Sequence, residues 1–433
     1  MDGAPMTEQV PHRRTVPPDS PEAAEIARLT ALVGERLQRR FDDLNASMNE
    51  AIEEAIVDLG DPDLTDMLHA SVEGNIATIL HMLRHDIPLE RVQPITAATE
   101  YAIRLAQRGV PGTSLRRAYH FGSDDLLGQA FEEVRQIDVD PDTRLRLLHH
   151  LAGWMHSYVD WITRIVLDAH EGERRQVEER SASIAATLVR RVLEDSTGAH
   201  HDFAERTGYR LDQHHVAAVV WMAGANPAVD HTDALKSLAD ELGSATGSSA
   251  ALFTAVDRST AWVWWGRNGD ASPLAADVVE LVLTRHEQAR VALGQTGRGA
   301  AGFRTSHRQA GAARDLARAA STGQQVTAHG DRAVAVVAML LHDMHDLAGW
   351  VGDVLGPLAA DTDNAARLRE TLLTFLVSGS YQATGERLML HRNTVKYRVD
   401  RALELRSRGL EDRLDVELAL ESVRLLGDVL LSR

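Results

Sequence analysis

A short run near the carboxyl end of the chain carries side chains that can recognise nucleic acid. Arg392, Asn393 and Lys396 stand close together there. Guanidinium and ammonium groups pair with phosphates or guanine edges, and an asparagine amide suits an adenine edge. We expect Asn393 to contact adenine and Lys396 to contact guanine or phosphate. The full set of candidate DNA contacts is Arg387, Arg392, Asn393, Thr394, Lys396, Tyr397, Arg398 and Arg401, of which Arg387, Arg398 and Arg401 are assigned to phosphates.

The surrounding residues predict two short helices joined by a tight turn. The first helix is expected over residues 382–388, and the second is expected to open near Arg392. Apolar residues fall on one inward stripe, namely Leu388, Leu390, Val395, Val399 and Leu403. Val399 and Leu403 are therefore predicted to be buried. A second helix of this kind is suited to a DNA major groove. An ordinary helical hairpin with a solvated basic face is the alternative.

Local charge supports the nucleic-acid interpretation. Residues 385–408 contain seven cations and three anions, a net charge of +4, whereas the whole chain has a formal charge of −17. A basic island on an acidic protein indicates one small DNA-contacting module. The acidity of the rest argues against broad, non-specific binding of nucleic acid.

Composition limits the other classes of function. The chain has 433 residues, of which 44% are hydrophobic and 25% charged, so we expect a globular protein of about three domains. It has no cysteine, which excludes disulfides, thiolate metal sites and a cysteine nucleophile. No apolar run reaches the roughly 18–20 residues of a membrane span. Residues 1–21 are proline-rich without an apolar signal core, which predicts a disordered arm and a cytoplasmic protein.

Residues 22–170 predict a helical bundle. One apolar stripe covers residues 37–59 and is ended by Asp61 and Pro62; the next covers residues 64–83. A third helix is expected over 93–108. A fourth is expected to be capped by Thr113 or Ser114 and to run to Val134, and a last helix to run from Pro141 to about residue 170.

The bundle gives little evidence for chemistry. His81 and His85 have the spacing of two metal ligands on a helix, but no third ligand accompanies them, so no metal site is predicted. The same holds for His149, His150 and His156. The aromatic stripe of Trp154, Tyr158 and Trp161 favours core or dimer interface over a ligand cage. A small-molecule effector in an apolar pocket between the helices stays open.

Residues 171–200 are predicted to form a linker helix. Charged residues come first, and apolar Ile184, Leu188 and Val192 then recur at intervals of four. Pairing with a second copy in a dimer and a solvated linker are both compatible with so short a repeat.

The middle segment, residues 201–330, changes period. Strands are predicted at 214–222, 250–256, 261–265 and 289–293, and helices at 233–242, 273–287 and 306–319. This order is typical of a ferredoxin-like or nucleotide-cyclase palm. Trp262 and Trp264 are expected on one face of their strand and Trp265 on the other, all three as packing residues. A helical connector follows at 331–365, and the DNA-binding domain is assigned to 366–433.

The C-terminal residues resemble the PucR/CdaR family of bacterial transcription regulators. Residues 388–398 (LMLHRNTVKYR), Asp412 and residues 417–420 (ELAL) carry this resemblance, and residues 355–358 (LGPL) resemble the segment before its DNA-binding module. Residues 291–294 and 301–310 are similar to the family's GGDEF-like domain. Residues 109–119, with the helical pattern around them, are similar to RsbR-type sensor domains.

The departures from these families bear on function. A diguanylate cyclase needs a hairpin with two glycines and adjacent carboxylates to hold nucleotide and Mg²⁺. The corresponding turn, residues 256–260 (VDRST), has neither, so the resemblance implies a non-catalytic coupling or dimerisation domain. The glycines of residues 294–299 lack the lysine of a phosphate-binding loop and predict a flexible loop. The family's usual glycine after the recognition helix is replaced near Arg406, which leaves the end of that helix open.

His342, Asp343 and His345 are expected on a helix, without a metal. We therefore expect a multidomain α and α+β protein: an N-terminal helical bundle, a central ferredoxin-like or GGDEF-like palm and a C-terminal all-α helix-turn-helix. Its expected function is a cytoplasmic, homodimeric transcription regulator that binds double-stranded DNA at an inverted-repeat operator. An effector or a partner protein would bias the bundle. No catalytic residue, cofactor or enzyme activity is predicted. The rivals are an RsbR-like signalling scaffold that acts through protein contacts and a divergent nucleotide cyclase.

Overall fold

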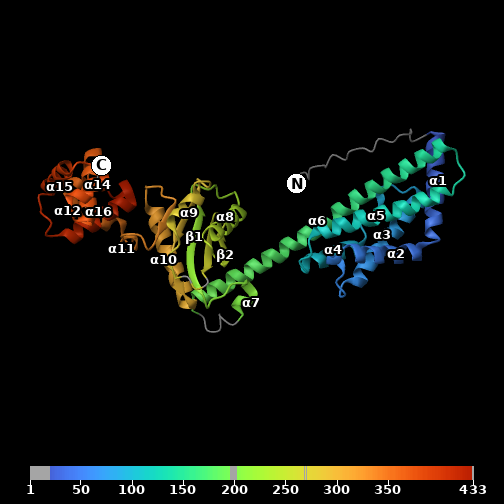
Figure 1. Ribbon diagram of the computed structural model, residues 1–433, viewed down its shortest axis with the longest axis horizontal. Helices are drawn as coiled ribbons and strands as arrows, with labels where there is room; N and C mark the ends of the chain where they lie inside the picture. Colours follow the sequence, from blue (N-terminus) through green and yellow to red (C-terminus); the bar gives the residue numbers. More distant parts are fainter. Residues whose placement is uncertain (1–19, 196–201, 268, 270, 432–433) are drawn as a thin grey trace. The chain divides into compact units, whose positions relative to one another are not determined.

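The computed structural model describes residues 20–195, 202–267, 269 and 271–431. The chain divides into two compact units between Arg180 and Ser181, and the long helix α6 (Pro141–Leu193) is continuous across that point (Figure 1). The predicted N-terminal arm lies outside the described residues as far as residue 19. Its last two residues belong to α1, because Ser20 caps that helix and Pro21 is its first residue.

The first unit is the predicted helical bundle. Its helices are α1 (Pro21–Gln38), α2 (Phe41–Ala55), α3 (Thr65–His85), α4 (Thr96–Gln107), α5 (Gly112–Arg135) and the first part of α6, with short 3-10 turns at Val57–Leu59 and Leu89–Arg91. Helix α3 packs against α1, α2 and α4. The apolar stripes of all six helices meet in one buried core.

Three helix boundaries in the bundle differ from the predictions. The stripe over residues 37–59 belongs to two helices rather than one, because the chain turns at Arg39 and Arg40, where the Arg40 N–H bonds to the Leu37 carbonyl at 2.9 Å. Neither Thr113 nor Ser114 caps α5; the Ser114 hydroxyl donates to the Asp58 carboxylate at 2.6 Å. Helix α6 continues past residue 170 to Leu193, so the last bundle helix and the predicted linker helix are one element.

The palm forms the middle of the chain. After α7 (Phe203–Thr207) it contains β1 (His214–Met222), α8 (Thr232–Ala245), β2 (Ala250–Asp257), β3 (Thr260–Arg267), α9 (Ala276–Leu283), β4 (Ala289–Leu293), β5 (Gly297–Arg298), α10 (Gly299–Ala319) and β6 (Val326–Ala328). The strand order is β2-β3-β1-β4-β6, with β5 paired to β1. Strand β1 runs antiparallel to β3 and β4, and β6 runs parallel to β4. The predicted alternation of strands and helices is confirmed.

The two faces of the sheet have separate cores, and the tryptophans of β3 show the division. Trp264 stacks on Phe303 of α10 at a ring distance of 4.3 Å, and Trp262 packs against the same core. Trp265 points to the opposite face, where its indole N–H donates to the Ala239 carbonyl of α8 at 3.0 Å. The predicted split of these three residues, and their packing role, are confirmed.

The glycine-rich segment 294–299 is not a free loop as predicted. Gly297 and Arg298 pair with β1 as strand β5. A Cβ on Gly294 would lie 2.0 Å from the Ser306 carbonyl oxygen, and one on Gly297 would lie 2.6 Å from the Cα of Gly302. These glycines therefore allow the backbone to pass directly against α10. The segment is a packing element, and α10 begins at Gly299 rather than at residue 306.

The connector contains α11 (Val334–Leu340), α12 (Met344–Leu355) and a 3-10 turn at Gly356–Ala359. His342 lies in the turn between the two helices rather than on a helix as predicted. Asp343 caps α12, because its carboxylate accepts from the N–H groups of His345 and Asp346 at 3.0 and 3.1 Å. Across the described ranges, no group of three or more His, Asp or Glu side chains is placed to hold a metal.

Among the described residues, no single helix is long and apolar enough to cross a membrane. The bent pair formed by α11 and residues Met344–Ala359 has the length and apolar composition of a span, and nothing more than these two properties points to one.

Candidate nucleic-acid interface

The C-terminal module is built from four helices. They are α13 (Asp363–Ser378), α14 (Tyr381–Leu388), α15 (Arg392–Arg406) and α16 (Arg413–Leu426), followed by a 3-10 turn at Gly427–Leu430. Helix α13 packs on both α14 and α15. Ser380 caps α14 through its hydroxyl, and the His391 ring caps α15 by accepting from the Asn393 N–H at 3.3 Å. The predicted start of the second helix at Arg392 is confirmed, and the first helix begins one residue earlier than predicted.

The turn between α14 and α15 is held by backbone contacts. The Leu390 N–H bonds to the Gly385 carbonyl at 2.8 Å, and Met389 adopts the left-handed conformation with φ of 53°. A Cβ on Gly385 would lie 2.6 Å from the Leu390 carbonyl oxygen. The glycine therefore allows the tight approach that sets the direction in which α15 leaves the turn.

The inward side of α15 anchors the helix. Val395, Val399 and Ala402 are buried in the core of the module. Leu403 is half-buried and packs against that core, so the prediction of full burial is confirmed for Val399 and wrong for Leu403. The reason is that Leu403 lies one position from Ala402 and so sits at the edge of the buried stripe.

The end of α15, left open by the sequence, is fixed without a glycine. Ser407 takes the left-handed position with φ of 55°. The preceding Arg406 side chain is fully buried and donates to three acceptors: the Val354 carbonyl at 2.9 Å, the Gly409 carbonyl at 2.9 Å and the Asp412 carboxylate at 2.7 Å. A buried guanidinium bonded in this way ties the helix end to α12 and to the loop before α16.

The outward side of α15 carries the free polar groups. Arg392, Asn393, Lys396 and Tyr397 are all exposed there, and Arg387 is exposed on α14. Among the described residues, the charged groups of Arg387, Arg392 and Lys396 have neither an ion-pair nor a hydrogen-bond partner. Arg398 and Arg401 of the same module do have such partners. Three cations thus keep their full capacity for an external anion.

The other three predicted contacts are placed less openly. Thr394 is half-buried. Arg398 is half-buried, and its Nη1 lies 3.5 Å from the Thr371 hydroxyl of α13. Arg401 is exposed but pairs with Glu404 at 3.0 Å. The eight candidates therefore divide into an unpaired exposed group and a group that also contacts the module itself.

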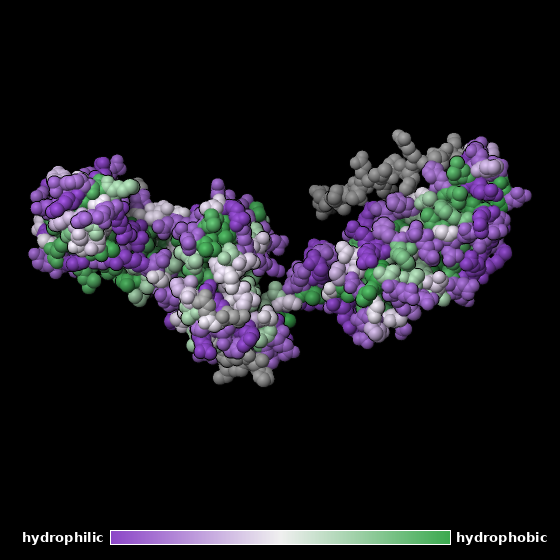
Figure 2. Space-filling model, in the orientation of Figure 1, coloured by the Kyte–Doolittle hydropathy of each residue, from purple (hydrophilic) through white to green (hydrophobic). Residues whose placement is uncertain are grey.

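The structure adds residues that the sequence did not single out as contacts. Met389, at the tip of the turn, is 92% exposed, and His391 is exposed at the start of α15. Asp400 and Glu404 share the exposed side of α15, and their carboxylates reduce the positive charge toward the end of the helix. The available signal for Met389 was an apolar residue in the short turn between the two helices. Hydrophilic residues predominate on the visible surface of this region (Figure 2).

Ion pairs connect α16 to the segment after the palm. Arg332, between β6 and α11, pairs with Glu421 at 2.6 Å and also with Glu417. Glu421 is buried and accepts from Arg424 as well, at 2.6 Å. The Ser321 N–H, just after α10, bonds to the Leu426 carbonyl at 3.0 Å. The palm and the C-terminal module are thus joined by specific polar contacts in addition to the connector.

Three family models match the chain. The model of the RsbT co-antagonist protein rsbRD N-terminal domain matches residues 41–185, that of the GGDEF-like domain matches residues 194–316, and that of the PucR C-terminal helix-turn-helix domain matches residues 368–422. The last match contains α14 and α15 with all eight predicted contacts.

A solved structure, that of a regulator of polyketide synthase expression from Bifidobacterium adolescentis, is similar to part of the chain. It is 18% identical, with a TM-score of 0.30, over 55% of this chain and 91% of the other. A comparison with curated proteins gave no match.

Proposed function

We propose that this chain, whose rsbRD-type, GGDEF-like and PucR-type domains form the architecture of PucR/CdaR-type transcription regulators, binds duplex DNA through α15 in a sequence-specific manner. The observation that carries the proposal is the exposed row of α15, where the side chains of Arg392, Asn393 and Lys396 have no hydrogen-bond or ion-pair partner among the described residues. Unpaired donors at the start of a well-anchored helix suit base edges in a major groove. We propose a cytoplasmic location on the same ground.

The division of the candidates suggests their roles. Asn393 suits an adenine edge and Lys396 a guanine edge or a phosphate. Arg387, Arg398 and Arg401 suit phosphates. Arg398 and Arg401 also contact Thr371 and Glu404, which favours a place at the margin of the interface, where the DNA backbone lies. Thr394 and Tyr397 complete the proposed surface, with Met389 beside them as an apolar contact.

We further propose a homodimer on an inverted-repeat operator. A single α15 contacts few base pairs, and two copies related by a twofold axis would contact half-sites about 34–36 Å apart. A signal received by the bundle would change the separation of the two α15 helices. Two features support this relay: α6 is continuous from the bundle to the second unit, and Arg332 links the segment after the palm to α16.

We propose that the palm has no cyclase activity. Its β2–β3 turn is closed by Asp257, whose carboxylate accepts from the Ser259 N–H at 2.8 Å and the Ser259 hydroxyl at 3.0 Å. That carboxylate is engaged by its own turn, and no glycine pair lets a nucleotide approach the backbone. Product analysis after incubation with GTP or ATP and Mg²⁺ should find no cyclic nucleotide, and any cyclic product would contradict this assignment.

The two lysines of the chain allow a direct test of DNA binding. Lys396 lies on α15 and Lys236 lies on α8 of the palm, and both are exposed. Amine acetylation followed by mass spectrometry should show Lys396 protected by operator fragments selected from genomic DNA, and Lys236 equally reactive with and without DNA. Equal reactivity of Lys396 in the complex would remove it from the interface.

Substitutions give the energetic counterpart. We expect Arg392→Ala and Lys396→Ala each to weaken operator binding by about 1–3 kcal/mol where the side chain contacts a base. Where the side chain contacts a phosphate, we expect the slope of log K against log salt concentration to fall by about 1. Lys236→Ala is the matched control and should bind like the parent. If the parent chain shows no salt-dependent binding to any duplex, the proposal fails, and a scaffold acting through protein contacts becomes the better explanation.

A further inference from the structure

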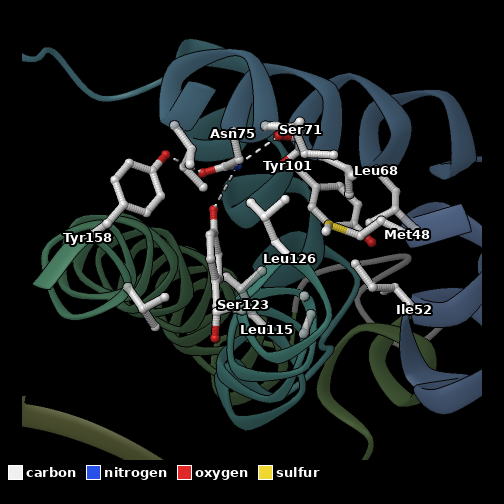
Figure 3. A pocket seen from close by; sticks show the side chains of 17 residues that line it. Met48, Ile52, Leu68, Ser71, Asn75, Tyr101, Leu115, Ser123, Leu126 and Tyr158 are labelled. Carbon is white, nitrogen blue, oxygen red and sulfur yellow. Dashed lines mark hydrogen bonds between the residues drawn. The ribbon is translucent and has the colours of Figure 1, made fainter. Parts of the chain in front are cut away.

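The N-terminal bundle contains a partly open cavity that the DNA-binding function does not use. It lies among α2, α3, α4, α5 and α6 and has a volume of about 60 Å³ (Figure 3). Most of its wall is aliphatic, with Met48, Ile52 and Leu126 among the residues in view. Well-packed protein cores contain few voids larger than one water molecule. The cavity in the bundle is several times larger than the space that one water molecule needs.

One polar group on the wall is fully used. Asn75 receives a hydrogen bond from the Tyr158 hydroxyl at 2.9 Å, and its own amide donates to the Ser71 carbonyl at 2.7 Å and to the Tyr119 hydroxyl at 3.4 Å. The bonds to Tyr119 and Tyr158 connect α3 to α5 and α6, and Figure 3 shows Asn75 and Tyr158 among the residues around the cavity. Asn75 therefore has a structural role at the cavity rim.

Another polar group on the wall is not used. Tyr101 of α4 is 1% exposed, and its hydroxyl is buried without a hydrogen-bond partner among the described residues. Burial raises the pKa of the Tyr101 phenol, so the group stays protonated and can donate. A buried hydroxyl without a partner is unfavourable, and its position on a cavity wall is where a ligand could supply the acceptor.

The charge of the wall restricts the ligand. None of the 17 lining residues is acidic, basic or histidine. An ionised ligand would lose its hydration with no counter-charge in return, which strongly opposes its binding. The ligand class is therefore neutral.

We propose that this cavity binds a small neutral molecule with an aliphatic body and one hydroxyl or carbonyl group, which accepts a hydrogen bond from Tyr101. One water-sized atom occupies about 10–15 Å³ of such a volume, so the ligand has about four to six non-hydrogen atoms. Short-chain alcohols and ketones have this size and chemistry. The inference names the effector class of the proposed regulator and rests on that function for its biological meaning, whereas the binding itself is measured independently of DNA.

Small residues on α5 keep the cavity open. Gly122 lines it, and a Cβ there would lie 3.3 Å from the Met48 sulfur. Gly128 lies on the same helix, is exposed, and has nothing within 4 Å of an added Cβ. Gly122→Ala and Gly128→Ala thus form a matched pair: both add one methyl group and raise helix propensity, but only the first narrows the cavity.

The test uses the full-length protein with 1-butanol as the probe, and butyrate and butylammonium as charged probes of the same length. The Met48 methyl resonance reports on the cavity. We expect 1-butanol to shift it saturably, with a dissociation constant on the order of 10⁻⁴–10⁻³ M for so small a ligand, and the charged probes to leave it unchanged. A linear shift with 1-butanol, or equal saturable shifts with the charged probes, would overturn the proposal.

Variants then locate the site. Gly122→Ala should weaken 1-butanol binding several-fold and Gly128→Ala should leave it unchanged. Tyr101→Phe should weaken 1-butanol about tenfold, the effect of one hydrogen bond, while binding of xenon, which has no acceptor, persists. If Tyr101→Phe binds 1-butanol as the parent does, the hydroxyl is not the donor and the proposed ligand class is wrong.

Operator affinity with and without saturating 1-butanol separates this inference from the proposed function. An operator affinity that changes with 1-butanol supports both the ligand site and the proposed relay to the DNA-binding module. Saturable binding in the cavity with unchanged operator affinity would reject the relay and leave the ligand site standing. An unmoved Met48 resonance would reject the ligand site whatever the operator affinity does.

Discussion

The C-terminal module and the N-terminal bundle are both all-helical, yet they treat buried polar groups in opposite ways. In the C-terminal module, the Arg406 guanidinium is completely buried and reaches three acceptors. This buried guanidinium has a partner at each nitrogen, although the Asp412 Oδ1 atom beside it has none among the described residues. In the bundle, the Tyr101 hydroxyl is buried beside a cavity and has no hydrogen-bond partner among the residues that the structure describes.

This difference fits different tasks. A buried charge with a partner at each of its three nitrogens favours one arrangement of the helices around it, because a shift leaves these donors and acceptors unpaired. Such rigidity suits a surface that presents Arg392 and Lys396 to a fixed DNA geometry. A core with a cavity and an unused donor is less completely determined, and a ligand can change its stability. The palm has a related feature, since the half-buried His307 ring keeps its buried Nε2 without a partner among the described residues.

The largest expected effect tests the rigid side of the comparison. Arg406→Met should lower the free energy of unfolding of the second unit by about 3–5 kcal/mol, because it leaves two carbonyls and the Asp412 carboxylate without their donor. Chemical denaturation of the full chain, followed at that transition, measures the loss. Arg401→Met is the control: Arg401 is exposed and pairs only with Glu404, so its loss should be within about 0.5 kcal/mol. Similar losses for both would break the comparison.

A pH experiment tests the palm. Burial against Trp262 and Trp264, together with the charge of Arg314, lowers the pKa of His307 to about 4. Between pH 6.5, the ordinary pKa of histidine, and pH 4, the unfolded chain binds a proton at this residue that the folded chain does not. The free energy of unfolding therefore falls as the pH falls through this range, by up to about 3 kcal/mol.

His307→Gln isolates this contribution from those of the other histidines. The difference in unfolding free energy between the parent and His307→Gln should change steadily across the window from pH 6.5 to 4. A difference independent of pH would show that His307 is protonated equally in the folded and unfolded chains.

The smallest expected effect tests the bundle. Tyr101→Phe removes a hydroxyl that has no partner and should leave stability unchanged or raise it by about 1 kcal/mol. Tyr158→Phe removes a hydroxyl that donates to Asn75 at 2.9 Å and should lower it by about 1 kcal/mol. Thermal unfolding of the two variants beside the parent compares the signs directly. A loss for Tyr101→Phe as large as that for Tyr158→Phe would show that the Tyr101 hydroxyl is bonded after all.

Some helix bounds could be predicted from the sequence and others could not, depending on whether local residues or tertiary packing set them. The bounds of α14 and the start of α15 were predicted within one residue, because the apolar positions around them are local signals that act within one or two turns. The break at Arg39 and Arg40 was missed, because residues on both sides continue one apolar spacing and only packing shows that they lie on two helices. The glycines at 294 and 297 suggested a loop, because their contact with α10 is invisible in the residue order.

By itself, the residue order determined the sequence of domains, the palm's alternation of strands and helices, and the identity of the polar residues at the start of α15. These depend on local periodicity, turn chemistry and charge, which neighbours along the chain decide. Only the tertiary structure decided which of the eight cations and polar groups stand free, how α15 ends at Ser407 without a glycine, and that Tyr101 lacks a partner beside a cavity. Those features depend on burial and on contacts between residues far apart in the chain, such as Arg406 with Val354, which no local pattern encodes.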